Sequence, residues 1–517
     1  MTTGERSGRF AVGRGNAPRA MAERLPNAGA PGAAGAIALA AVCVAVMAAG
    51  LFLPMMLGIP LDPSVTLLAP GMLLAVYLAW WNEKAWIYAA ILSHLLFMVD
   101  STPDTIGLGE IAFGALGLAG LALWFVKEMV ICRRRIVDSS FDLLLMSFMI
   151  VSTAVTLIAN TLHGGDLLQY LKEYGVVVDL LFYFPLRKNI TSRRDVIMLL
   201  CAFVGVALVN GAISFLNYRE RLAEAVFQWQ LTASRSNLNE STSQALFVLG
   251  TTLFAYSKRL WLRLLSLALA AAGLVFLLVS FSRSPIVAAL LALAIMILMS
   301  PFRNGRRVVV ALFMALFVGA AAALIIFPQI ATNVGQALAE RVLSVASTGS
   351  DRSFNARIVE STAILKNYFG YSPILGCGFG VPYKYLDPLS NTTLKGYFVH
   401  NGYVWSLFKF GVPMALMFLW VLVQPLLRLL LRAPRRHEGF DRALLAGAVG
   451  YVLCAFIVNM TSNLFTQVST ILNIVICWVL FEYVQRNAMA RDARARAGSD
   501  EPQAFGHAGG PLVEGAR

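Results

Sequence analysis

The sequence predicts an all-α membrane protein that crosses the bilayer many times. Of its 517 residues, 58% are hydrophobic and only 14% are charged, which is typical of polytopic helical proteins and not of soluble domains. The hydrophobic residues also gather in apolar runs between residues 35 and 485. Most runs are long enough to cross a hydrocarbon core of ~30 Å as a helix. We therefore expect about 12–14 transmembrane helices.

The chain begins and ends with polar segments. Residues 1–34 are rich in Arg, Gly and Ala and have no apolar face, and residues 486–517 are similarly polar. Both are expected to be disordered tails. The run that follows the first tail, 35–57, is too long for the apolar core of a cleaved signal peptide. It is therefore expected to stay in the membrane.

The apolar runs divide into two membrane regions, 35–327 and 402–485. The first region contains these runs: 35–57, 64–81, 85–99, 106–126, 141–160, 167–185, 195–216, 241–256, 262–281, 285–300 and 308–327. The second contains three more: 402–425, 443–460 and 468–485. Between the two regions lies the longest hydrophilic segment of the membrane part, residues 328–401.

Basic residues predict which side of the membrane each loop faces. Short loops on one side carry arginine clusters: Arg133-Arg134-Arg135, Arg193-Arg194 and Arg306-Arg307. Three short loops on the other side carry no Lys or Arg. Cytoplasmic loops are the basic ones, so both termini are predicted to be cytoplasmic and segment 328–401 external. The net charge of +14 is thereby explained by topology, and nucleic-acid binding is not expected.

The external segment 328–401 is expected to contain structure of its own, because unstructured loops of this length are uncommon. Apolar residues from Phe354 to Phe369 approximate one face of a helix, with Ser353 as a candidate N-cap. Residues 372–380 then end the helix and contain three glycines, which favours a tight path. We expect the segment to pack over the membrane region as a lid.

Four arginines near the external side are candidates for binding a charged group: Arg283, Arg341, Arg352 and Arg357. Arginine presents a planar fork of donors that matches a phosphate group. Arg283 lies between two apolar runs, where an arginine can instead reach the lipid headgroups. Arg357 can instead pair with Glu360 one turn away, and the other two can be solvated charges.

His400 lies where the external segment returns to the membrane, followed by Asn401 and Tyr403. Histidine titrates near neutral pH and can accept a proton from a hydroxyl nucleophile. The alternative is an ordinary interfacial or capping histidine. Within the membrane region, Lys172 and Asp179 share a helical face and are expected to form a structural pair.

The six cysteines and five histidines do not support a disulfide framework or a metal centre. Only Cys377 lies in the external segment, and the histidines do not cluster with the cysteines. The glycines at 376–380 are not a dinucleotide fingerprint, because no strand precedes them. No cofactor is expected.

Three motifs in order resemble the superfamily of bacterial O-antigen ligases and polymerases. Phe281-Ser282-Arg283-Ser284 is similar to the family's Ser-Arg turn between two central helices. Arg357 and the glycine-rich residues 372–380 resemble its loop arginine and the segment after it. His400-Asn401-Gly402-Tyr403 resembles its His-Asn motif. The resemblance covers about residues 235–425.

The resemblance implies a metal-independent glycosyltransferase of the membrane-embedded (GT-C-like) class in the bacterial inner membrane. Its donor is a polyprenyl-diphosphate-linked glycan, such as one on undecaprenyl diphosphate, and its loop is periplasmic. It implies that Arg283 and Arg357 stabilise the leaving diphosphate and that His400 activates or orients the acceptor hydroxyl. Arg352, Arg341, Tyr403 and Asn401 are the further candidates for substrate binding.

Several functions remain open at this point. A polymerase extends one lipid-linked repeat of O-antigen or exopolysaccharide with another, a ligase transfers a finished glycan to lipid A-core, and a third branch glycosylates protein. Polysaccharide assembly partners are possible for each, and membrane lipids surround all of them. A flippase or transporter for lipid-linked oligosaccharide is the alternative from another class, and it would place charged residues near the middle of the bilayer.

Overall fold

The computed structural model describes these residues: 74, 77–97, 114–224, 240–280, 282–299, 302–326, 352–387, 392–432 and 439–499. The predicted N-terminal tail, the first predicted span, most of the second, Arg341 and residues 500–517 lie outside this part of the chain. Residues 486–499 of the predicted C-terminal tail are helical, so the expectation of disorder is wrong for them. All described residues belong to one compact unit, residues 62–517.

The described chain is almost entirely helical. Its first helices are α3 (Glu83–Phe97), α5 (Gly120–Phe125), α6 (Ser140–Leu162), α7 (Leu167–Val178), α8 (Tyr183–Asn189) and α9 (Arg193–Glu224). The central ones are α11 (Glu240–Tyr256), α12 (Leu260–Val279), α13 (Arg283–Met299) and α14 (Phe302–Ile326). The last elements are α16 (Arg352–Tyr371), β1 (Tyr383–Asp387), β2 (Thr392–Gly396), α17 (Gly402–Arg432), α18 (Phe440–Val458) and α19 (Val468–Ser499).

Seven helices of the described part are long and apolar enough to cross a membrane. They are α6, α9, α12, α14, α17, α18 and α19. Helix α13 is apolar but shorter. The prediction of an all-α polytopic membrane protein is therefore confirmed, while the total of about 12–14 spans stays a prediction.

Helix α11 packs against α9, α12, α13, α14, α18 and α19. Small residues allow the closest of these approaches. A Cβ added to Gly250 of α11 would lie 2.6 Å from the backbone N of Ala270, and one added to Gly273 of α12 would lie 2.6 Å from that of Phe247. Replacing either glycine would therefore push α11 and α12 apart.

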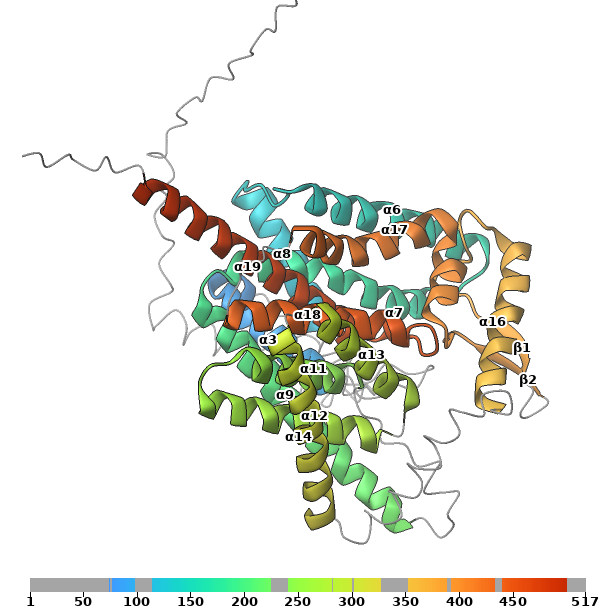
Figure 1. Ribbon diagram of the computed structural model, residues 1–517. Coiled ribbons are helices and arrows are strands. Elements are labelled where there is room, and N and C mark those ends of the chain that lie inside the picture. Colours follow the sequence, from blue (N-terminus) through green and yellow to red (C-terminus); the bar gives the residue numbers. More distant parts are fainter. Residues whose placement is uncertain are drawn as a thin grey trace, which may run out of the picture. The chain divides into compact units, whose positions relative to one another are not determined.

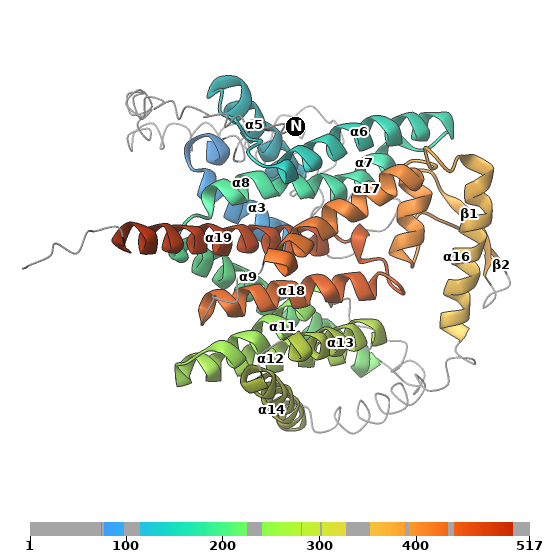
Figure 2. The same cartoon turned by 45° about the horizontal axis from the view of Figure 1, so that its top comes forward.

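Helices α6 and α17 pack side by side and define the two ends of the molecule used below (Figures 1 and 2). The loop end carries α16, β1 and β2. The network end carries the first turn of α6 and the second half of α19. A helix of 23 residues such as α6 spans about 35 Å at a rise of 1.5 Å per residue, so the two ends are far apart.

A bend in α17 attaches the loop segment to the membrane helices. Gly411 leaves the helical conformation (φ 74°, ψ 169°). Pro413 has no N–H to donate to the carbonyl of Lys409, and that carbonyl instead accepts the N–H of Gly378 at 3.1 Å. The break in the helix therefore supplies the acceptor that binds the loop.

The glycine-rich segment follows a path that only glycine tolerates, as predicted. Gly376, Gly378 and Gly380 all have positive φ, between 69° and 79°. A Cβ on Gly378 would lie 2.5 Å from the backbone N of Asn160 in α6. The glycines are therefore required by the close contact of this segment with α6 and α17.

The structure differs from the sequence prediction in three local features besides the helical residues 486–499. The loop helix α16 begins at Arg352, so Ser353 lies inside it and is not its N-cap. The chain then forms an antiparallel hairpin of β1 and β2, which was not predicted. The predicted span 167–185 is divided into α7, a 3₁₀ turn and α8, because Pro185 cannot donate a hydrogen bond to the preceding turn.

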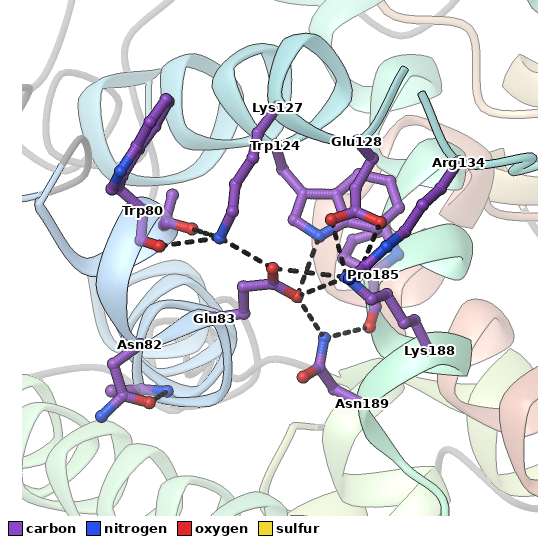
Figure 3. Close-up of polar contacts among 12 residues, drawn as sticks. Trp80, Asn82, Glu83, Trp124, Lys127, Glu128, Arg134, Pro185, Lys188 and Asn189 are labelled. Atoms are coloured by element: carbon purple, nitrogen blue, oxygen red, sulfur yellow. Dashed lines mark hydrogen bonds and ion pairs between the residues drawn. The ribbon is translucent and has the colours of Figure 1, made fainter. Parts of the chain in front are cut away.

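Charged side chains are paired extensively at the network end (Figure 3). The carboxylate of Glu83 pairs with Lys127 Nζ at 2.9 Å and with Lys188 Nζ at 3.0 Å. Lys188 Nζ also pairs with Glu128 Oε1 at 2.8 Å. Burial alone raises the pKa of Glu83, but the hydrogen bonds from Lys127 and Lys188 outweigh it and lower the pKa to about 2. These pairs join α3, α8 and the helical turn after α5.

Arg187 is the centre of a second group at the same end. Its Nη1 lies 2.5 Å from Asp142 Oδ2, and its Nε lies 2.9 Å from Glu482 Oε2. Glu482 Oε1 also accepts the hydroxyl of Tyr183 at 2.6 Å. Arg187 thus ties α8 to α6 and α19.

Candidate active site

His400 lies between β2 and α17 and is held by a buried carboxylate. Its Nδ1 lies 2.8 Å from Glu360 Oε2, and its backbone N–H donates to the same oxygen at 3.2 Å. The side chain of His400 is 41% exposed, whereas that of Glu360 is 2% exposed. The imidazole therefore contacts a buried glutamate of α16, while the His400 side chain itself is partly exposed.

Tyr383 of β1 completes this group. Its hydroxyl contacts Glu360 Oε1 and the carbonyl oxygen of Phe398. Burial, together with the negative charge of Glu360, holds the pKa of Tyr383 well above its ordinary value, so the hydroxyl keeps its proton near neutral pH. The hairpin, which sequence analysis did not identify, thereby positions a residue beside His400.

Asn401 begins α17 as its N-cap. Its Oδ1 accepts the N–H groups of Tyr403 at 3.0 Å and Val404 at 3.1 Å, which satisfies donors that a helix start leaves unpaired. Its Nδ2 donates to the carbonyl of Met460 at 3.0 Å, in the turn between α18 and α19. Asn401 therefore fixes where the helix behind His400 begins.

Gly402 allows the start of α17 to approach the same turn. Its N–H donates to the carbonyl of Asn459 at 2.9 Å. A Cβ at this position would lie 2.3 Å from Asn459 Oδ1. The His-Asn-Gly order thus has a structural explanation: a cap followed by a residue without a side chain.

Arg357 is anchored on the same turn as Asn401. Its Nη1 donates to the carbonyl of Thr461 at 2.6 Å, next to the carbonyl of Met460 that Asn401 binds. A backbone carbonyl orients a guanidinium without cancelling its charge. The turn between α18 and α19 therefore brings a half-buried arginine of α16 and the residues around His400 to one place.

Tyr403 faces α18. Its hydroxyl donates to the carbonyl of Phe456 at 2.8 Å, and its ring packs edge-on against Phe465. These contacts hold the first turn of α17 in place, which is the structural role of Tyr403.

Arg283 is the first residue of α13, directly after the turn that the sequence predicts. Ser280 Oγ accepts the N–H of Ser282 at 3.3 Å, and Gln244 of α11 donates to the carbonyl of Pro285 at 2.9 Å. Arg352 is the first residue of α16. The contacts above place Arg357 and Asn401, the neighbour of His400, on adjacent carbonyls. The functional roles of all the predicted site residues stay predictions.

A buried ion pair anchors the loop beside the site. Lys409 of α17 is fully buried, pairs with Glu173 Oε2 at 2.9 Å and donates to the carbonyl of Val381 at 2.9 Å. Glu173 also accepts the N–H of Gly380 at 3.1 Å. Sequence analysis selected Lys172 and Asp179 as a deep pair, yet Asp179 lies beyond the end of α7 in a 3₁₀ turn. The pair between Glu173 and Lys409 joins residues too distant in sequence for periodicity to predict it.

These features define an all-α, multi-pass membrane protein whose hydrophilic loop folds onto the start of a membrane helix. Residues 267–419 match the family model described as O-antigen ligase, so the chain contains a domain of the O-antigen ligase superfamily. A search of curated proteins finds no match. The matched residues include Arg283, Arg357 and His400. The family implies a glycosyl-transferring enzyme with lipid-linked glycan substrates.

Proposed function

We propose that the protein is a metal-independent glycosyltransferase that joins a polyprenyl-diphosphate-linked glycan to an acceptor hydroxyl at the periplasmic face of the inner membrane. One observation carries the proposal within the O-antigen ligase domain. Arg357 and Asn401, the neighbour of His400, bind the adjacent carbonyls of Thr461 and Met460. This arrangement supports a site in which Arg357 binds an anion and His400 accepts a proton.

The proposed reaction needs these two groups. The acceptor oxygen attacks the anomeric carbon of the donor glycan, and a new glycosidic bond forms as the bond to the diphosphate oxygen breaks. The proton of the acceptor hydroxyl passes to His400. Negative charge develops on the departing lipid diphosphate, where Arg357 and Arg283 stabilise it. Arg352 and Arg341 are the weaker candidates for the same anion.

The acceptor decides between two forms of this reaction. A second lipid-linked repeat as acceptor makes the protein a polymerase of O-antigen or exopolysaccharide, and lipid A-core as acceptor makes it a ligase. We place polymerisation first, because the chain has predicted spans and polar tails in addition to the residues that match the O-antigen ligase model. Both forms use the same arginine and histidine chemistry.

The test is a deletion strain complemented with wild type or His400→Ala. Envelope glycans are separated by size into lipid A-linked, polyprenyl-linked and released pools. A polymerase predicts single repeats on the polyprenyl carrier in the deletion and in His400→Ala. A ligase predicts long polyprenyl-linked chains and loss of the lipid A-linked glycan. Unchanged glycans in the deletion strain would overturn the proposed function, and unchanged glycans with His400→Ala would overturn the role of His400.

A further inference from the structure

We infer that Glu360 is a positioning residue that holds His400 in the tautomer with its proton on Nδ1, so that Nε2 is the atom that accepts the substrate proton. The inference rests on the proposed function. The histidine motif alone does not say which ring nitrogen is the base, and the contacts of Glu360 do.

The first step concerns Glu360 Oε2, which faces two groups of His400. The backbone N–H of His400 is always a donor, and it points at Oε2 from 3.2 Å. Nδ1 lies 2.8 Å from the same oxygen. Imidazole is a stronger base than a carboxylate, so the proton between them stays on nitrogen. Oε2 therefore accepts two hydrogen bonds from one residue.

The second step concerns Oε1, which faces the hydroxyl of Tyr383. That hydroxyl also contacts the carbonyl oxygen of Phe398, which can only accept. One arrangement has Tyr383 donating to Glu360, and the other has a protonated Oε1 donating to Tyr383 while Tyr383 donates to Phe398. Oε2 is an acceptor in both, so the tautomer of His400 is the same.

The third step concerns the other ring nitrogen of the imidazole. Nδ1 faces a glutamate that is 2% exposed, Nε2 lies across the imidazole ring from Nδ1, and the His400 side chain as a whole is 41% exposed. The ring of Phe398 packs edge-on against the imidazole, with the ring centres 5.2 Å apart, and restrains its plane. The unprotonated Nε2 is thus the ring nitrogen that Glu360 does not occupy, and it is the one left to accept a proton from the acceptor hydroxyl.

The arrangement also favours the product of proton transfer. When Nε2 takes the proton of the acceptor hydroxyl, His400 becomes a cation while Nδ1–H remains bonded to Glu360. A carboxylate bonded to the far nitrogen orients the ring and stabilises that cation, as in other carboxylate–histidine pairs. Glu360 does not touch the substrate, so its role is exerted through His400.

The first experiment measures the tautomer directly. The full-length protein is labelled with ¹⁵N-histidine in lipid bilayers and studied by solid-state NMR above the titration range of histidine. The chain has five histidines, and the His400→Ala spectrum identifies the signal of His400. We expect a protonated Nδ1 and an unprotonated Nε2. A protonated Nε2 would overturn the inference, and this measurement on the wild type does not depend on whether any Glu360 variant folds.

The second experiment compares two matched substitutions, Glu360→Gln and Glu482→Gln. Each glutamate binds a tyrosine hydroxyl and a basic side chain: Tyr383 and His400 for Glu360, and Tyr183 and Arg187 for Glu482. Initial transfer rates are measured per folded molecule, with membranes of the deletion strain as the source of donor and acceptor. We expect Glu360→Gln to lower the rate about 10²-fold, mostly in kcat, and Glu482→Gln to change it less than about twofold.

The carboxylate itself is tested by Glu360→Asp, which should restore part of the rate that Glu360→Gln loses. A Glu360→Gln protein that transfers at the wild-type rate would overturn the inference. If His400→Ala is inactive in the same assay, the proposed function still stands. If His400→Ala is fully active, the base role in the proposed function fails first. The two failures are thereby distinguished.

Discussion

Each end of the molecule contains a glutamate that binds a tyrosine hydroxyl and a basic side chain, and the two groups differ in their surroundings. At the network end Glu482 binds Tyr183 and Arg187, and at the loop end Glu360 binds Tyr383 and His400. Arg187 is permanently charged, is only 18% exposed and also binds Asp142. Histidine is a residue type that can gain and lose a proton, and the side chain of His400 is 41% exposed. The groups therefore differ in their third member, and we propose that this member makes one group structural and the other catalytic.

The wider surroundings of the two groups follow the same division. Basic residues at the network end, such as Lys127 and Lys188, pair with carboxylates. At the loop end Arg357 donates to the backbone carbonyl of Thr461, which positions its guanidinium on the turn that also binds Asn401. Stability is therefore expected to depend mainly on the network end and transfer mainly on the loop end. Four substitutions test this division.

The largest effect on stability is expected for Arg187→Ala. This change leaves Asp142, whose side chain is fully buried, without its charged partner. Breaking a buried ion pair in this way lowers the free energy of unfolding by about 3–5 kcal/mol. The measurement is denaturant unfolding of the purified protein in detergent. A variant as stable as wild type would show that the network end does not hold the helices together.

Gly402→Ala is expected to impair both properties. The added Cβ would meet Asn459 Oδ1 at 2.3 Å and push the start of α17, with His400, away from the turn that holds Arg357. We expect a transfer rate at least about tenfold lower and a loss of stability of about 1–3 kcal/mol. Gly205→Ala is the control, because a Cβ there meets nothing within 4 Å and neither Gly205 nor Gly402 has a positive φ. Equal effects of the two substitutions would argue against a steric cause at Gly402.

Arg357→Lys separates charge from geometry. Lysine keeps the positive charge but loses the planar fork that binds a carbonyl and a phosphate together. We expect transfer to fall about tenfold, mainly through kcat, with stability within about 0.5 kcal/mol of wild type. A wild-type rate would mean that a point charge is enough at this position.

The smallest effect is expected at Glu83, and it depends on pH. The pKa of Glu83 is lowered from 4.5 to about 2 by Lys127 and Lys188. The stabilisation is therefore present above pH 4.5 and is lost as the pH falls toward 2. Glu83→Gln should be less stable than wild type at pH 7, and the difference should shrink between these two pH values. A stability difference that does not change with pH would show that the ion pairs of Glu83 are not its cause.

Much of the fold is predictable from the sequence because membrane helices are marked by local hydrophobicity. Every predicted span from residue 141 onward corresponds to helix in the structure, apart from the break after α7. The glycine path was also predictable, since its conformational requirement is local. The hairpin was missed, because two strands of five residues each resemble ordinary loop sequence.

The site was only partly predictable, for a related reason. Arg357 and His400 were selected by their residue types and their place beside the membrane. Glu360 was recognised as a candidate partner of Arg357, one helical turn away, whereas the structure directs its carboxylate to His400 and Tyr383. These partners are 40 and 23 residues away in sequence, and no helical or strand period links residues at such distances.

The most direct test is the transfer rate of purified His400→Ala beside Arg187→Ala, each corrected for the amount of folded protein. The donor and acceptor are supplied by membranes of the deletion strain. The account predicts that His400→Ala is as stable as wild type but transfers about 10²–10⁴-fold more slowly, while folded Arg187→Ala transfers at nearly the wild-type rate. A folded His400→Ala protein that transfers glycan at the wild-type rate would contradict the account.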